Sequence, residues 1–327
     1  MVFGSEEGVR FLSDVDQWHV DGTFHTAPRH FTQTMVIRGV NEDGETASCV
    51  WAFISDKHES SYDEIFRDLN HYAVLELGVH LTPRNVMCDF EAGLRNALKK
   101  NYGLSNGDIQ GCFFHLRKNS ISQMKKRGVF TLYKRGGRTS TFLKCFDALA
   151  FLPEDLVEPG FEALMRANPR PNDNRLANFC KYKEVNYIGD RCVVRRGNMR
   201  LRLTNRRAPR FPISSWNQYT RTLLRMARTN NVCEGYHSSL RQLCRQKPNV
   251  FMATDSVRRE IRRFNKMIRR KEFTPKRATK LQRKRDRKLY QAVTDLRWRR
   301  IAGLPLNLRE VLEKMAAAMI SLKPRRR

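Results

Sequence analysis

The sequence predicts an α/β protein, with a mixed sheet flanked by helices, on two observations. Residues 16–55 alternate apolar and polar positions in three runs, which is the pattern of strands. From residue 60 to about residue 126 the helical period takes over and is broken by two short strand-like runs. At 327 residues and 40% hydrophobic content, the chain can also bury a substantial core.

The first three strands are expected to be antiparallel. They cover Gln17–Val20, Thr32–Val40 and Ala47–Ile54, and Asp21 ends the first of them. The turn Asn41–Gly44 separates the last two strands, and an Asp-Gly pair between alternating runs is a hairpin signal.

Helices and strands then alternate. Ser60 or Ser61 is the expected N-cap of a helix whose apolar face contains Tyr62, Ile65, Phe66 and Leu69. After it we expect a strand over Asn85–Cys88, a helix over Glu91–Lys100, a strand around Asp108–Phe113 and a helix from His115 to about Lys126. This order matches a ribonuclease H-like core, in which Asp21 and Asp89 end strands that lie side by side.

The whole chain divides into four expected segments. Residues 1–138 are the first part of the core, 139–212 a mostly helical insertion, 213–250 the final core helices with Glu234, and 251–327 a basic helical C-terminal region. Helical periods mark Thr141–Leu152, Glu154–Ala167 and Ser215–Met226, whereas Val185–Leu203 is irregular or strand-like. The C-terminal helical stretch is interrupted near Phe273–Pro275.

The charge of the chain indicates a polyanionic partner. With 62 Lys and Arg against 33 Asp and Glu, the formal net charge is +29, and nucleic acid is the leading candidate for such a surface. A membrane surface is the rival for any basic protein, but no apolar stretch is long enough to span a bilayer and no lipidation signal is present. Phosphate-loop and dinucleotide glycine motifs are absent, so we expect no nucleotide cofactor.

The eight cysteines are scattered without a paired spacing, and several lie in apolar runs where a reduced cysteine acts as a small hydrophobe. A reducing compartment fits this usage, and the N-terminus lacks a secretory signal, which leaves the nucleus or the cytoplasm. Of the two we expect the nucleus. Because the chain begins barely one element before Asp21, we also expect that an upstream domain has been lost or was never cloned.

Three acidic residues on separate predicted elements form a candidate metal site. Asp21 and Asp89 each follow an apolar run, and Glu234 lies in a helix-forming context. Two divalent ions roughly 3.5–4 Å apart assist in-line displacement at a phosphodiester, and Mg²⁺ prefers oxygen ligands. We expect Asp21 to bridge two Mg²⁺ or Mn²⁺ ions, Asp89 to hold one and Glu234 to close the other side. Each acid alone would be interpreted as a solvated or capping residue.

Four short segments, in this order, resemble the transposase domain of Mutator-like elements (MULE). They are Asp21-Gly22-Thr23-Phe24, Cys88-Asp89-Phe90-Glu91-Ala92, Gly111-Cys112-Phe113-Phe114-His115 and Asn231-Val232-Cys233-Glu234-Gly235, and the resemblance covers roughly residues 15–245. It implies a ribonuclease H-like core that cleaves and transfers DNA strands with metal ions, and usually works as a homo-oligomer on DNA. Asp21, Asp89 and Glu234 match the family's triad, and Cys112 and His115 match its cysteine-x-x-histidine element.

Three further residues near these motifs have open roles. Cys112 and His115 can be interpreted as half of a zinc site, but a closed site needs four ligands and no second pair has a suitable spacing. We favour a packing role for Cys112 at the strand end and a place for His115 near the catalytic face. His237 shares a helical face with Glu234, as a metal ligand or as a supporting or surface residue.

A basic stretch after residue 250 is the candidate DNA-backbone contact, with a solvated helix face as the alternative. Its residues are Arg258, Arg259, Arg262, Arg263, Lys266, Arg269, Arg270 and Lys271. Trp216 can stack on an unpaired base, although core packing against Tyr219 and Leu223 is favoured.

Two functions follow from these observations. The first is a DDE-type DNA transposase core that performs metal-dependent strand cleavage and strand transfer. The alternative is a catalytically silent, truncated or domesticated remnant that acts as a DNA-binding protein. The zinc-binding module with which such family members often recognise element ends is not visible in this sequence.

Overall fold

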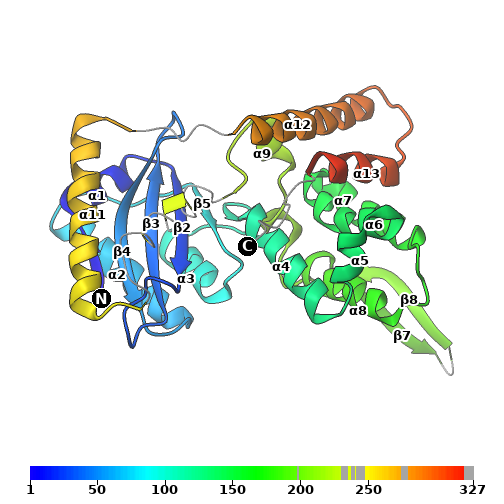
Figure 1. Ribbon diagram of the computed structural model, residues 1–327, viewed down its shortest axis with the longest axis horizontal. Coiled ribbons are helices and arrows are strands. Elements are labelled where there is room, and N and C mark those ends of the chain that lie inside the picture. Colours follow the sequence, from blue (N-terminus) through cyan, green and yellow to red (C-terminus); the bar gives the residue numbers. More distant parts are fainter. Residues whose placement is uncertain (197–198, 230–234, 237–239, 241–246, 274–278, 320–327) are drawn as a thin grey trace. The chain divides into compact units, whose positions relative to one another are not determined.

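The computed structural model describes residues 1–196, 199–229, 235–236, 240, 247–273 and 279–319 (Figure 1). The chain forms two compact units, each assembled from segments that are distant in sequence. Residues 1–112 and 229–277 make up the first, here called the sheet unit, and residues 113–228 and 278–327 make up the second, the helical unit. The expected C-terminal segment, 251–327, is therefore divided between the two units.

The sheet unit contains a six-stranded mixed sheet of order β1-β4-β3-β2-β5-β6, flanked by helices, which confirms the predicted α/β class (Figure 1). The central strand β2 pairs antiparallel with β3 and parallel with β5. The elements are β1 (Val2–Gly4), α1 (Glu6–Ser13), β2 (Gln17–Thr23), β3 (Gln33–Val40), β4 (Thr46–Ile54), α2 (Glu59–Leu75), β5 (Asn85–Cys88), α3 (Ala92–Tyr102), β6 (Ile109–Gly111) and α11 (Val250–Arg270).

One face of the sheet packs against α2 and α3. The indole ring of Trp18 on β2 contacts the ring of Tyr102 on α3 with centroids 5.2 Å apart, and Phe66 on α2 contacts the same tyrosine at 5.5 Å. Because side chains alternate along a strand, Val20 shares this face with Trp18, and both are fully buried. We call this side the α2–α3 face.

The opposite side, the α11 face, carries His19 and Asp21 of β2 by the same alternation. The cross-strand partners are His19 with Arg38 and Asp21 with Val36, and Val36 in turn lies opposite Trp51. The ring of Trp51 lies 6.1 Å from that of Phe264 on α11, so α11 covers this side of the sheet. Asp21 therefore belongs to the face on which α11 packs.

Two local expectations were wrong in detail. β2 does not end at Asp21, because Gly22 and Thr23 continue the ladder opposite Met35 and Thr34. Strand pairing here overrides the low intrinsic β-propensity of Asp and Gly. Helix α2 begins before Ser60 and Ser61, and the Asp56 carboxylate accepts hydrogen bonds from the His58 N–H and the Ser61 hydroxyl instead. The edge strand β1 and helix α1 had not been predicted.

The helical unit matches most of the predicted helical periods and adds a two-stranded ribbon, β7 with β8. Its elements are α4 (Phe113–Lys126), α5 (Phe130–Arg135), α6 (Gly137–Ala148), η1 (Leu149–Phe151), α7 (Glu154–Arg166), α8 (Asn174–Lys183), η2 (Glu184–Ile188), β7 (Arg191–Arg196), β8 (Met199–Arg206), η3 (Ile213–Ser215), α9 (Tyr219–Leu223), α12 (Lys280–Ile301) and α13 (Leu308–Met319).

The helix predicted over Ser215–Met226 is only partly formed. Ile213–Ser215 is a short 3₁₀ turn, and Trp216 leaves the helical path to donate its indole N–H to the Phe211 carbonyl at 3.1 Å. The Trp216 ring is buried and meets the ring of Tyr187 edge-on. The prediction that Trp216 packs in the core is confirmed. The aromatic ring that it contacts is Tyr187, whereas the sequence had suggested Tyr219.

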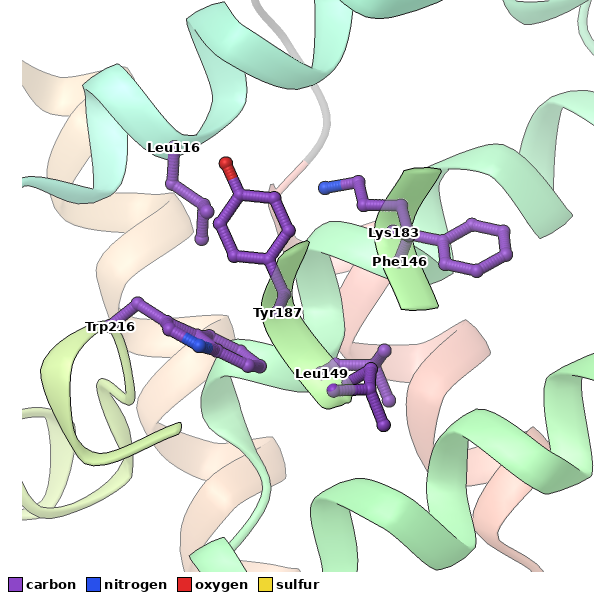
Figure 2. A pocket seen from close by; sticks show the side chains of 7 residues that line it. Leu116, Phe146, Leu149, Lys183, Tyr187 and Trp216 are labelled. Atoms are coloured by element: carbon purple, nitrogen blue, oxygen red, sulfur yellow. The ribbon is translucent and has the colours of Figure 1, made fainter. Parts of the chain in front are cut away.

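A buried charged cluster ties three helices of this unit together. The Lys183 ammonium on α8 donates to Asp147 Oδ1 on α6 at 3.2 Å and to the Ser120 hydroxyl on α4 at 2.5 Å, and Arg117 lies 3.7 Å from the same carboxylate. Burial lowers the pKa of Lys183, and Asp147 opposes that shift. Lys183 and Tyr187 line a cavity of about 10 Å³, together with Leu116, Phe146, Leu149 and Trp216 (Figure 2). This volume holds about one water molecule, so the cluster is a packing feature.

Within the residues that the structure describes, no helix is long and apolar enough to cross a bilayer. The cysteines described there are free thiols, and Cys49, Cys88, Cys112, Cys145 and Cys180 are buried. This agrees with their predicted role as small hydrophobes. Cys233 and Cys244 lie outside the described residues.

We predict that Asp147→Ala lowers the free energy of unfolding by about 3–5 kcal/mol, because the charges of Lys183 and Arg117 would remain buried without their anion. Asp155→Ala is the control, since it removes the exposed partner of Arg300 and should cost at most about 1 kcal/mol. Urea denaturation followed by circular dichroism measures both. A cost for Asp147→Ala no larger than that of the control would contradict this role of the cluster.

Candidate active site

Strand register brings two of the predicted acidic residues to the same level. In the parallel pair β2–β5, Gln17 lies opposite Asn85, Trp18 opposite Val86 and His19 opposite Met87. Paired residues of β2 and β5 are thus 68 positions apart in the sequence (85 less 17). Asp21 and Asp89 are separated by the same number of positions (89 less 21). Since Met87 faces His19, alternation assigns Asp89 to the α11 face as well. Continued one residue past the end of β5, this register sets Asp89 level with Asp21 of β2.

The two carboxylates differ in exposure. Asp21 is 5% exposed, and its Oδ1 accepts a hydrogen bond from the N–H of Gly22 at 3.0 Å. Asp89 is half-buried, directly after β5, and its Oδ1 accepts from the N–H of Phe90 at 2.6 Å. Burial raises the pKa of the neighbouring Cys88 thiol to about 11, and the charges of Asp89 and Asp21 both add to this rise. The negative charges of both acids therefore act on the same buried thiol.

Tight packing fixes the turn that carries Asp89. The ring of Phe90 lies against Gly111 of β6, where an added Cβ would come within 2.3 Å of the ring. The next residue, Cys112, is fully buried and donates its N–H to the Cys88 carbonyl at 2.9 Å. Its burial is consistent with the predicted packing role of Cys112, which stays a prediction.

Glu234 and His237 lie outside the described residues, but their neighbours Gly235 and Tyr236 are helical. The hydroxyl of Tyr236 accepts a hydrogen bond from the indole N–H of Trp51 at 2.7 Å, and the Arg38 guanidinium lies 5.2 Å from the centre of the Tyr236 ring. Trp51 and Arg38 project from the α11 face. The segment that follows Glu234 is therefore attached to the sheet face that carries Asp21.

His115 is buried in the first turn of α4, in the helical unit, whereas Cys112 closes the first segment of the sheet unit. Its predicted place near the catalytic face stays a prediction. Among the described residues, no group of three or more His, Cys, Asp and Glu side chains is placed to hold a metal ion. Of the predicted triad, only Asp21 and Asp89 belong to that described part, because Glu234 lies outside it.

All eight predicted basic residues on and after α11 are exposed. Four of them have an acidic partner: Arg259 with Asp255, Arg263 with Glu260, Arg269 with Glu7 and Arg270 with Glu272. Arg258, Arg262 and Lys266 follow one another at four-residue spacing and therefore share one face of α11. Within the described part of the chain, no acidic side chain pairs with these three residues, which we call the α11 stripe.

A hydrogen-bonded chain that includes Glu91, two residues after Asp89, had no role in the sequence-based prediction. Gln33 donates to the Tyr62 hydroxyl, which donates to Glu91 Oε1, and Lys57 Nζ lies 2.6 Å from Glu91 Oε2. Burial raises the pKa of Tyr62, and the hydrogen bond to Glu91 adds to this. Tyr62 had been assigned to an apolar helix face, and no local pattern marks Lys57.

We predict that Gly111→Ala displaces Phe90 and lowers the free energy of unfolding by about 1–3 kcal/mol, the usual cost of overpacking. Gly107→Ala is the matched control in the preceding loop, where the nearest atom to an added Cβ is a side-chain oxygen at 3.7 Å. Thermal or urea denaturation measures both variants. Equal stability of the two would show that contact between Phe90 and Gly111 does not fix the Asp89 turn.

Comparison with known families places these residues in one domain. Residues 17–119 match the family model of the MULE transposase domain, and this match includes Asp21, Asp89, Cys112 and His115. No curated protein matches the chain. The matched segment runs from β2 into α4 and contains the parallel strand pair that aligns the two aspartates. Residues 17–119 are therefore similar to the MULE transposase domain, which indicates a transposase.

Proposed function

We propose that this protein is the core of a DDE-type DNA transposase that cleaves and transfers DNA strands with divalent metal ions. In this proposal the sheet unit is a ribonuclease H-like core, and Asp21, Asp89 and Glu234 are its triad. The observation that carries the proposal is the register between β2 and β5, which aligns Asp21 with Asp89 inside the MULE transposase domain. Carboxylates on adjacent strands of a rigid sheet suit the binding of ions that act on one phosphodiester.

The donor chemistry of these residues fits Mg²⁺ or Mn²⁺. Asp21 and Asp89 supply only carboxylate oxygens, the ligand type that hard divalent cations prefer. When bound, two such ions would activate the attacking oxygen and stabilise the leaving oxygen.

The α11 face supports the assignment of Glu234 to the same site. Tyr236 lies two residues after Glu234 and is attached to Trp51, and Trp51 lies opposite Val36, the cross-strand partner of Asp21. That buried hydrogen bond fixes Tyr236 at this face, two residues along the chain from Glu234. In this proposal, Glu234 completes the ligand set.

DNA is the proposed substrate, and the α11 stripe is its proposed backbone contact. Arg258, Arg262 and Lys266 present three exposed charges along one helix, without acidic partners in the described residues. Such a row binds phosphates by releasing counterions and positions DNA without reading its sequence. A nuclear location and assembly into a homo-oligomer on DNA are part of the same proposal.

We expect Asp89→Asn and Asp21→Asn each to reduce metal-dependent strand cleavage by about a thousandfold or more, because each removes a charged ligand worth several kcal/mol in the transition state. Asp43→Asn, an exposed aspartate in the β3–β4 turn, is the control and should retain activity. Gel-based cleavage of labelled duplex DNA in Mg²⁺ measures the rate. Undiminished cleavage by Asp89→Asn would rule out the triad.

The same assay separates the two candidate functions. A wild-type chain that binds DNA with a steep salt dependence, but never nicks it in Mg²⁺ or Mn²⁺, would favour the binding remnant over the transposase core.

We expect the double variant Arg258→Gln/Arg262→Gln to bind duplex DNA more weakly and to reduce the slope of log affinity against log salt by about 0.9 for each phosphate that is no longer neutralised. The control is Arg259→Gln/Arg263→Gln, which removes the same charge from ion-paired positions on α11. Fluorescence anisotropy titrations at several salt concentrations give the slopes. Equal slopes for the two double variants would mean that only net charge matters and would remove the stripe from the proposal.

A further inference from the structure

An exposed aromatic ring lies at the end of the strand that carries Asp21. Phe24 directly follows β2 and is 54% exposed, although Thr23 before it is buried. Leaving so much of a phenylalanine ring in water forgoes a large part of the stabilisation that its burial would bring. A ring in this position therefore calls for an explanation other than core packing.

Lys57 holds a positive charge over this ring. Its Nζ lies 4.7 Å from the centre of the Phe24 ring and 2.6 Å from Glu91 Oε2, and its side chain remains 42% exposed. The ammonium group has three N–H donors, so a salt bridge to Glu91 leaves donors for another anion. Phe24 and Lys57 together form an exposed surface that consists of an apolar ring and, over it, an ammonium group with N–H donors left for another anion.

The scaffold behind Lys57 is buried and constrained. Glu91 accepts a hydrogen bond from the hydroxyl of Tyr62, a fully buried side chain of α2. The backbone of α3 also approaches the Lys57 segment closely, since a Cβ on Gly93 would lie 2.7 Å from the Lys57 carbonyl oxygen. This arrangement fixes the lysine more firmly than an ordinary surface pair, whose two long side chains move freely.

Phe24 follows the strand that carries Asp21, and Lys57 is held by a residue of the segment that carries Asp89. Phe24 lies three residues after Asp21, and Glu91, which holds Lys57, lies two residues after Asp89. An exposed cation–π pair alone contributes only about 0.5–1 kcal/mol to stability. Fold stability therefore does not explain the exposed ring.

We propose that Phe24 and Lys57 form a binding platform for one unpaired nucleotide of the DNA substrate, at the end of the strand that carries Asp21. The base would stack on the Phe24 ring, and Lys57 would contact the adjoining phosphate. In an intact duplex both faces of a base are covered by its neighbours, so the platform selects a base that has left the stack. The proposal rests on the proposed function, because it assumes a DNA substrate at this site.

The test compares three DNA duplexes that share one sequence. One is blunt, one has a 3′ overhang of normal nucleotides, and one has the same overhang with abasic nucleotides, which keep the phosphates but lack bases. Affinities of the full chain are measured by fluorescence anisotropy in EDTA, so the result does not depend on cleavage. Stacking of a base on an aromatic side chain is worth roughly 1–3 kcal/mol.

We expect the wild-type chain to bind the normal overhang about tenfold more tightly than the abasic one. Phe24→Ala should abolish this preference and leave blunt-duplex binding unchanged, whereas Phe24→Trp should keep it. Tyr72→Ala is the control, because Tyr72 is another exposed aromatic residue, near the far end of α2, and the preference should survive there. Lys57→Gln should weaken binding of both overhangs alike and leave the base preference intact.

Two results would overturn the platform. One is a wild-type chain with equal affinity for normal and abasic overhangs, and the other is a Phe24→Ala chain that retains the preference. Because Phe24 is exposed, its substitution should leave the thermal transition in place, and the blunt duplex reports whether the variant is folded. Failure of the proposed function is a separate outcome, recognised by Asp89→Asn cleaving DNA as the wild-type chain does.

Discussion

The parallel pairing of β2 with β5 is the constraint on which the candidate site depends. Only in this register does Asp21, from the start of the chain, lie level with Asp89, from a strand that follows a whole helix. The pairing is held by apolar contacts on the α2–α3 face, above all by Trp18 against Tyr102. A slip of one residue would turn every side chain of β2 to the opposite face and separate the acids.

The α11 face combines burial with polarity. Arg38 is buried, and its guanidinium donates to the hydroxyls of Ser48 and Thr46 and lies over the rings of Tyr236 and Phe264. A buried cation without such partners would be costly, so the cluster requires α11 and the Tyr236 segment to pack where they do. This face thus joins residues from both ends of the sequence around the strand that carries Asp21.

The net charge of the protein acts on a polyanion over a long range, whereas the two acidic side chains act over a short one. The net charge of +29 produces a long-range attraction for a polyanion, and salt screens it over about 10 Å at 0.1 M. The carboxylates of Asp21 and Asp89 act only locally, and by themselves they would repel a phosphodiester. In the proposed function, divalent cations between the acids and the phosphate would reverse that local repulsion, and the α11 stripe would contact the DNA backbone elsewhere.

The sequence alone determined the α/β class, most element positions and the two acids of the β2–β5 pair, because alternation and helical period are local consequences of which face is buried. It did not determine that β2 continues through Gly22 and Thr23, since that depends on pairing with β3, or that Trp216 packs against Tyr187. Only the tertiary structure placed Lys57 over Phe24 and Trp51 against Tyr236. These contacts join residues from separate elements, up to 185 positions apart, and no local pattern encodes a contact that exists only after the sheet has formed.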